Sequence, residues 1–380
     1  MIPRNRSHQN SHWSQWTVAV TGINAKPENP GPGCAVARCL SESKDFRGRV
    51  VGLGYETLDA GLYHPEDCDG GYLLPYPASG SEALMERLDE ILRHDRIDAI
   101  IPNLDAELPN FIALQPTLAK RGVRMLLPGR PALRNRDKDR LPVLCVEAGV
   151  ATPRVRQVSD ARFFDRCTSE EEGGWHYPLV VKGVFYDAYV VYDAVEAACR
   201  FRQIAKSWGY PVLVQSHVVG EEVNLTALGD GQGALIGPVM MRKQALTEKG
   251  KAWAGVAIDD GDLQAAGERL MKSLQWNGPL ELEMLRDTEG TLHLIEINPR
   301  FPAWVYLSQG VGRNLPIALL ALMQGVAVND LALAAPRPGV TFIRHARELI
   351  VQMEDIISVS MNGATLPRSN PVAVRPRRMA

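Results

Sequence analysis

The sequence predicts an α/β protein whose second half is α+β, and two observations support this fold class. In the first 130 residues, apolar runs of strand length alternate with amphipathic helical segments, which is typical of a parallel sheet covered by helices. In the second half, strand-like runs follow one another across short turns, which favours hairpins. A chain of 380 residues is long enough for two or three packed lobes.

The first region begins with a strand–loop–helix unit. Thr17–Ile23 is a β-rich apolar run that contains Gly22, and it is followed by the loop NAKPENPGPG and a helical segment from Cys34. A second strand is predicted from Arg49, and Ser81 is the expected N-cap of an amphipathic helix. The series continues with a strand, a helix and a closing strand at Ile97–Asn103, Leu108–Lys120 and Val123–Gly129.

The region after residue 130 combines helices and strands in a less regular order. A helix is expected to end at Ala148 with Gly149 as its stop, and Thr152 and Pro153 lead into a strand. Strands are also predicted in YPLVVKG and, as a pair, in YPVLVQSHVVGEEVNLTALGD. ALIGPVMMRKQALTEKGKAWAGVAI is expected to form a strand and then a loop rich in Gly and Lys. Further helices are predicted at Ala194–Trp208, Asp262–Leu274 and Leu315–Gln324, and a last strand and helix in VTFIRHARELIVQME.

Composition and charge disfavour several classes of protein. The net charge of −2 does not supply the concentrated basic surface that nucleic-acid binding needs. None of the six cysteines forms a CxxC pair, so neither a zinc knuckle nor a redox pair is expected, and a reducing cytoplasm is the simplest setting. The N-terminus lacks the apolar core of a secretory signal, and the longest apolar run, from Leu315, is too short to span a membrane.

The run LELEMLRDTEGTLHLIEINPR places acids within two alternating apolar strands. We expect Asp287 to oppose Gly290 across a two-residue turn, which makes Glu281 face Glu296. Glu283 is then the diagonal neighbour of Glu296, about 7–8 Å away between Cα atoms. Like charges on paired strands repel, and a cation such as Mg²⁺, which prefers oxygen ligands, would offset that cost. An acidic strand face without an ion is the alternative.

The hairpin ends in the pattern E-x-N-P-R, with an acid thirteen positions before its Glu. This pattern resembles the ATP-grasp superfamily, in which two acids and the Asn bind the magnesium ions that bridge the ATP phosphates. The resemblance makes Glu283 and Glu296 the two acids and Asn298 the third ligand. It implies two Mg²⁺ ions, with Mn²⁺ as an alternative, and it places Arg300 at the phosphates or the acyl-phosphate intermediate.

Two lysines earlier in the chain fit the same resemblance. RDKDRLPVLCVEAGVATP resembles the segment in which a DK pair opens a helix, and its Lys138 would reach an ATP phosphate. In YPLVVKG the terminal Lys182 would contact the α- and β-phosphates as a compact positive charge. A lysine on the surface of a helix is the alternative for Lys138.

VLVQSHVVGEEV resembles the adenine hinge of the superfamily. By that match Gln215 offers its side chain to adenine, and Ser216 and Val218 offer backbone groups. Glu222, seven residues after Gln215, lies where the superfamily has its ribose-binding carboxylate, which can accept hydrogen bonds from both ribose hydroxyls. Glu221 is the competing candidate, but the alternation of a strand would point it away.

Other charged groups remain as candidates. The stretch after Lys182 has Gly183 followed by bulky residues, whereas many ATP-grasp enzymes close a Gly-rich loop over the phosphates at this point. Basic residues that could instead serve ATP or an anionic substrate are Arg242, Lys243, Lys249 and Lys251. After the strand IDAIIPN, Asp105 and Glu107 either contact an amino group of a substrate or cap the next helix, and the cap is the preferred interpretation.

The resemblance also implies a domain order and an activity. The predicted parts are a flexible N-terminal segment, a pre-ATP-grasp α/β domain, a first ATP-grasp lobe and a second lobe with a C-terminal extension, at residues 1–16, 17–130, 131–220 and 221–380. The implied protein is a cytoplasmic, ATP- and Mg²⁺-dependent ligase that phosphorylates a carboxylate and joins it to an amine, with Lys182 and Arg300 as catalytic residues. Its partners would be small molecules, neither nucleic acid nor membrane, and a homodimer stays open. A nucleotide-binding regulatory protein and an ATP-dependent kinase are the alternatives.

Overall fold

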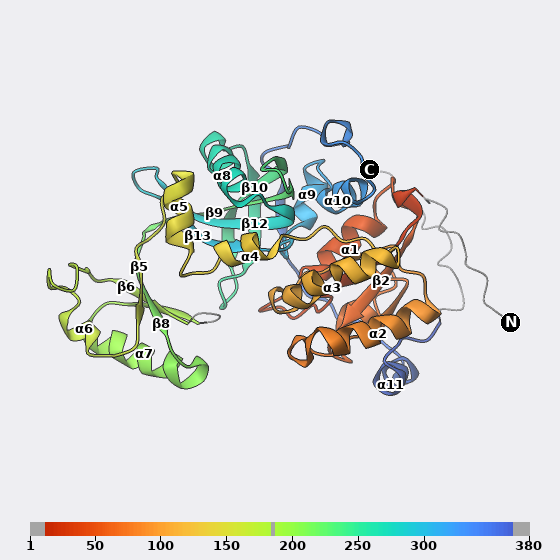
Figure 1. Cartoon of the computed structure of the whole chain (residues 1–380), viewed down its shortest axis with the longest axis horizontal. Helices are drawn as coiled ribbons and strands as arrows, with labels where there is room; N and C mark the ends of the chain where they lie inside the picture. The colour runs from red at the N-terminus through yellow and green to blue at the C-terminus, as the bar shows by residue number, and fades with distance from the viewer. Residues whose placement is uncertain (1–11, 184–186, 368–380) are drawn as a thin grey trace.

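The computed structural model describes residues 12–183 and 187–367, which contain three β-sheets (Figure 1). The first sheet belongs to an N-terminal domain and the second to a small lobe at the opposite end of the molecule. The third sheet lies between these two parts (Figure 1). Within the described ranges, no helix combines the length and apolarity needed to cross a bilayer.

The first sheet is parallel and has the strand order β3–β2–β1–β4. Its strands and helices are, in chain order, β1 Thr17–Thr21, α1 Gly33–Ser41, β2 Arg49–Gly54, β3 Gly70–Leu73, α2 Gly80–His94, β4 Ala99–Ile101 and α3 Leu108–Lys120. Because strands and helices alternate as the sequence indicates, the predicted parallel α/β architecture of this region is confirmed.

Two boundaries in this domain differ from the prediction. The 3₁₀ turn Pro77–Ser79 runs directly into α2, so Ser79 is the N-cap and Ser81 lies inside the helix. The segment expected as a closing strand makes a single β-bridge, between Ala99 and Arg124. This segment therefore contacts the edge of the sheet without adding a strand to it.

The sequence does not predict β3, because its letters GGYL include two glycines, which weaken a strand. The glycine at position 71 is required by close packing. A Cβ atom on Gly71 would lie 2.5 Å from the Leu62 side chain, so a larger residue would force Leu62 to shift.

The second sheet is antiparallel and has the order β5–β8–β6–β7. The elements of this lobe are β5 Val155–Val158, α6 Phe163–Arg166, β6 Leu179–Lys182, β7 Ala188–Val191, α7 Ala194–Trp208 and β8 Val212–Ser216. The predicted bounds of α7 are confirmed. Its N-cap is Asp193, whose carboxylate accepts a hydrogen bond from the Glu196 amide (2.8 Å).

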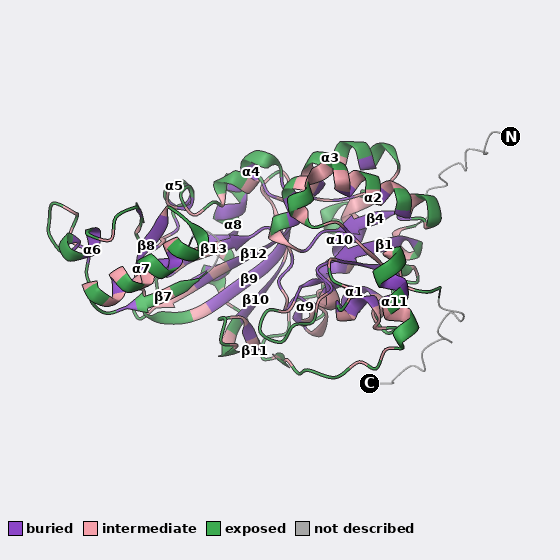
Figure 2. Cartoon of the chain, turned by 90° about the horizontal axis from the view of Figure 1, so that it is seen from below, coloured by how far each residue is buried: buried purple, intermediate pink, exposed green. Residues whose placement is uncertain are grey.

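The third sheet has six strands in the order β13–β12–β9–β10–β11–β14. Its strands are β9 Gly220–Asp230, β10 Leu235–Leu246, β11 Ala252–Ile258, β12 Asn277–Asp287, β13 Leu292–Asn298 and β14 Thr341–Ile343. The central strands β9 and β12 are buried over much of their length, whereas β10 is buried mainly in its first half (Figure 2). The prediction of a loop at β11 is wrong, because AWAGVAI pairs with β10 on one side and β14 on the other. The basic loop is thereby limited to residues 247–251.

Helices cover both faces of the third sheet. Met240 of β10 packs in a core with α5 (Leu141–Ala148) and α8 (Gly261–Leu274). Its neighbours Val239 and Met241 point the other way, into a core with α9 (Tyr306–Gly310) and α10 (Leu315–Met323) that continues into the N-terminal domain. The N-terminal domain and the third sheet therefore share one hydrophobic core.

Two connections complete the fold. The short helix α4 (Arg130–Asn135) leads from the first domain toward α5, which ends as predicted before Gly149 in the left-handed conformation (φ 62°). After β14 the chain returns to the first domain, where the Leu73 amide donates to the Gly363 carbonyl (2.8 Å). The last helix, α11 (Met353–Asn362), precedes this contact (Figure 1).

Candidate active site

The acidic hairpin β12–β13 has a different register from the predicted one. Three residues, not two, separate the paired positions Asp287 and Thr291, because the Asp287 carboxylate accepts hydrogen bonds from the amides of Glu289 (3.0 Å) and Thr291 (2.8 Å) and holds a wider turn. A bulge then shifts the pairing by one more residue. As a result Glu283 directly faces Glu296, closer than the predicted diagonal arrangement.

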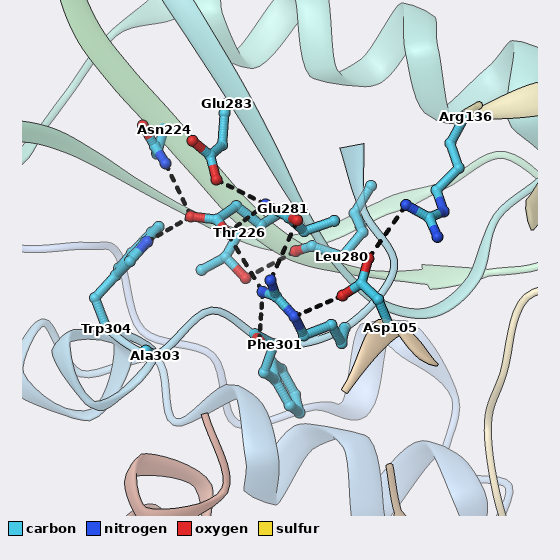
Figure 3. Close-up of polar contacts among 12 residues, drawn as sticks. Asp105, Arg136, Asn224, Thr226, Leu280, Glu281, Glu283, Phe301, Ala303 and Trp304 are labelled. Carbon is cyan, nitrogen blue, oxygen red and sulfur yellow. Dashed lines mark hydrogen bonds and ion pairs between the residues drawn. The ribbon is translucent and has the colours of Figure 1, made fainter. Parts of the chain in front are cut away.

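Glu281 occupies the inner end of this face and is 4% exposed. Its carboxylate accepts hydrogen bonds from Asn224 (2.8 Å), Trp304 (2.6 Å) and Asn298 (3.0 Å) (Figure 3). Burial raises the pKa of Glu281, and the nearby charge of Glu283 raises it further. The predicted pairing of Glu281 with Glu296 is wrong, since Glu281 pairs with Asn298 across the strands.

Asn298 links the inner and outer acids. Its amide nitrogen donates to Glu281 and to Glu283 (2.7 Å), while its amide oxygen accepts from Arg300 (3.2 Å). Burial alone would raise the pKa of Glu283, but the charges of Lys243 and Lys251 and the hydrogen bond from Asn298 lower it below its ordinary value. Glu283 is therefore held as a carboxylate.

Glu296 has a different environment, although it faces Glu283. Within the described residues its carboxylate has neither a hydrogen bond nor an ion pair. Its charge acts on Lys138 and Lys182, and in both cases it favours the protonated lysine. Glu296 and the two lysines, which come from three separate segments, are thus brought to one place.

Of the two lysines, Lys182 is buried in the small lobe and Lys138 is half-buried beside it. Lys182 is 8% exposed and donates to the side-chain oxygen of Gln215. Burial lowers the pKa of Lys182 to about 8, with a further contribution from Lys138. Lys138 lies in the turn before α5 and its ammonium is 3.4 Å from the Gly183 carbonyl. Burial lowers the pKa of Lys138 as well.

The predicted hinge follows β8. Gln215 is buried, and the Ser216 amide already donates to the Arg154 carbonyl (2.9 Å), so the backbone group through which Ser216 could bind a ligand is its carbonyl. The Val218 amide donates to no described residue. The pair Ser216–Val218 therefore offers one acceptor and one donor, the combination that an adenine edge requires. Residues 184–186, in the Gly-poor stretch, lie outside the described residues.

Lys243, a member of the predicted basic group, points into the site. Its side chain is 7% exposed, and its ammonium binds the Glu222 carboxylate and lies 3.4 Å from that of Glu283. Burial alone would lower the pKa of Lys243, but the two carboxylates raise it above its ordinary range. Glu221 points away toward Arg242 (3.8 Å), as the alternation predicts.

The predicted cap of the next helix is confirmed for Glu107 but not for Asp105. Glu107 caps the turn before α3, because it accepts hydrogen bonds from the backbone amides of Asn103 (2.8 Å) and Leu104 (2.9 Å). Asp105 forms no such cap and instead binds the guanidinium of Arg300, with 3.0 Å between Nε and Oδ1. The N-terminal domain thus contributes a carboxylate to this site.

Sequence reasoning missed several contacts of this cluster. Asn224 could have been found, since Glu222, Asn224 and Thr226 alternate along one strand and therefore share one face. The contacts of Trp304 and Asp105 carry no comparable signal, because Trp304 lies beyond the end of β13, where strand alternation no longer applies, and Asp105 is far from the hairpin in sequence.

Comparison with known proteins places this fold. No model of a protein family matches the chain. The arginine-specific large chain of carbamoyl phosphate synthase from Bacillus subtilis (strain 168) is 23% identical over 167 residues, which cover 41% of this chain and 16% of that protein. The match therefore spans a small part of that relative.

Solved structures cover more of the chain. L-amino acid ligase from Bacillus licheniformis has a TM-score of 0.63 at 17% identity, over 86% of this chain and 78% of that one. The biotin carboxylase domain of 2-oxoglutarate carboxylase from Hydrogenobacter thermophilus, solved with MgADP, ADP and bicarbonate, has a TM-score of 0.61 at 17% identity, over 82% and 70%. The chain has the ATP-grasp fold that its motifs indicate.

Proposed function

We propose that this protein is an ATP- and Mg²⁺-dependent ligase that phosphorylates a carboxylate and joins the acyl phosphate to an amine. The observation that carries the proposal is the direct pairing of Glu283 with Glu296 beside Lys138 and Lys182. The solved ligases and carboxylases with this fold support the same reaction class.

The donor set fits magnesium in part. Two facing carboxylates are the ligands that Mg²⁺ prefers, and phosphate oxygens and water commonly complete its shell. The described residues contain no group of three His, Cys, Asp or Glu side chains that could hold a metal, so the nucleotide and water would complete the metal's shell. Asn298 would have to turn its amide to join Glu283 and Glu296, because its nitrogen now faces Glu283. Bound at this place, one or two Mg²⁺ ions, or Mn²⁺ in their stead, supply positive charge to the phosphates.

The other predicted residues would hold the nucleotide. Ser216 and Val218 would bind the adenine edge through backbone groups, next to the Gln215 side chain, and Glu222 would accept from the ribose hydroxyls. Lys138 and Lys182 would contact the phosphates. Since burial disfavours the charge on Lys182, an incoming phosphate would stabilise its protonated form.

The reaction needs charge neutralisation and positioning rather than a protein nucleophile. An oxygen of the substrate carboxylate attacks the γ-phosphorus, and the bond to the oxygen of the leaving ADP breaks. The amine nitrogen then attacks the acyl carbon and expels phosphate. Arg300 would stabilise the charge on the transferring phosphoryl group and on the acyl phosphate, and Lys182 would share this role.

A screen of substrate pairs tests the proposal. ADP release is measured with Mg²⁺ and candidate carboxylates alone, then with amines added, and products are identified by mass spectrometry. The ligase requires both substrates; turnover with one substrate would identify a kinase, and ATP binding without turnover a regulatory protein. The cytoplasmic location, the homodimer and the domain bounds remain predictions.

A further inference from the structure

The guanidinium of Arg300 is held at its outer edge by the N-terminal domain. Arg300 lies after β13 and Asp105 lies after β4, yet Nε of Arg300 is 3.0 Å from Oδ1 of Asp105 (Figure 3). The second carboxylate oxygen of Asp105 is 3.2 Å from Nη1 of Arg136, in the segment that leads to Lys138. The Asp105 carboxylate therefore connects the segments that carry Arg300 and Lys138, two predicted phosphate-binding residues.

All three guanidinium nitrogens of Arg300 have partners. Nη1 donates to the Phe301 carbonyl (3.2 Å) and Nη2 to the Asn298 amide oxygen (3.2 Å), while Nε is bound by Asp105. Because a guanidinium is a rigid planar fork, contacts on three sides fix both its position and its plane. The Arg300 side chain is only 14% exposed, so water cannot easily replace a lost contact.

Asp105 also balances the acids on the opposite side of Arg300. The Arg300 guanidinium is 3.6 Å from the Glu281 carboxylate, and the charges of Glu283 and Glu296 attract it as well. Without Asp105, these three acids would draw the guanidinium inward, toward the place where metal and phosphates are proposed to bind. Asp105 is the carboxylate that pulls in the opposite direction.

We propose that Asp105 is a positioning residue for Arg300, so that the N-terminal domain completes the phosphoryl-transfer site. The proposal rests on the ligase function described above. It differs from a general role in holding the domains together, since other contacts do that. Glu42 of the N-terminal domain, for example, accepts a hydrogen bond from the Tyr306 hydroxyl of α9 (2.6 Å), outside the acidic cluster.

The test compares Asp105→Ala with Glu42→Ala in the full-length protein. Misplacing a positioned catalytic group costs about 100-fold in rate, so kcat for ADP release should fall about 100-fold in Asp105→Ala, with KM for ATP within about threefold of wild type. Glu42→Ala should keep the wild-type kcat. Equal losses in the two variants, or an unchanged kcat in Asp105→Ala, would overturn the proposal. If Asp105→Ala does not fold, Asp105→Asn replaces it in the test, because it keeps the side-chain shape and one acceptor. Its kcat for ADP release should fall about 10-fold.

A second readout needs no substrate. Labelling of Arg300 by phenylglyoxal, followed by peptide mass spectrometry, should become severalfold faster in Asp105→Ala and Asp105→Asn, and should be unchanged in Glu42→Ala. Unchanged labelling in both Asp105 variants would count against the positioning role even if the wild type shows no turnover. Absence of ADP release in the wild type would count against the ligase function instead.

Discussion

The inner and outer ends of the acidic hairpin face have similar charges but opposite surroundings. At the inner end, Glu281 is buried and receives hydrogen bonds from three side chains of the protein itself. At the outer end, Glu296 faces Glu283 and receives no hydrogen bond from a described residue. The difference indicates that Glu281 has a structural role and that Glu296 is available to a ligand. A carboxylate that already accepts several hydrogen bonds from the protein has few lone pairs left for a cation.

The largest expected effect is on turnover, at the outer end. Glu296→Gln should reduce kcat at least about 100-fold, because a metal ligand and a negative charge are lost where phosphate charge must be balanced. Circular dichroism and thermal melting should match the wild type, since no hydrogen bond of the described protein is removed. Glu289→Gln, at the exposed turn of the same hairpin, is the matched control. Wild-type turnover in Glu296→Gln would contradict the metal assignment.

Substitution at the inner end should lower the stability of the protein. Glu281→Ala leaves buried donors of Asn224 and Trp304 unpaired and removes a partner of Arg300, so the free energy of unfolding should fall by about 3–5 kcal/mol. Glu296→Ala should change it by less than about 0.5 kcal/mol. Urea denaturation of the two variants measures both values, and similar losses would erase the distinction between the two ends.

Lys182 gives a pH-dependent test near the outer end. Its pKa is lowered to about 8 in the folded chain, so between that value and its ordinary pKa the unfolded chain binds more protons, and stability rises with pH across this window. Below this pH window, Lys182 is charged in the folded protein, and burying that charge lowers the stability by up to about 3 kcal/mol. Lys182→Met should therefore be more stable than wild type at pH 7, and the difference should shrink toward pH 10. A difference that is independent of pH would argue against the lowered pKa.

The smallest expected effect is at the ribose position. Glu222→Gln should raise KM for ATP about 10-fold with little change in kcat, because a carboxylate whose contact with the nucleotide is limited to the ribose contributes equally in ground and transition states. Its neighbour Glu221, which points away, provides the control, and Glu221→Gln should keep the wild-type KM. If both variants behave alike in steady-state kinetics, the assignment of Glu222 fails.

Much of this site could be anticipated from sequence, because strand alternation and motif order are local properties. They correctly place Glu283 and Asn298 on one face and predict both ends of α7 without error. The register of the hairpin could not be predicted, since it depends on the hydrogen bonds that the Asp287 side chain makes with the turn and on a bulge. The contact between Asp105 and Arg300 joins residues 195 positions apart and follows from domain packing, which no local pattern encodes.

The most direct test of the account is a calorimetric titration of ATP into the protein with Mg²⁺ and again with EDTA. The account predicts that wild-type protein binds ATP much more tightly with Mg²⁺, and that Glu296→Gln loses this dependence while staying folded. Equal affinity of the wild type in both solutions, or full Mg²⁺ dependence in Glu296→Gln, would contradict it.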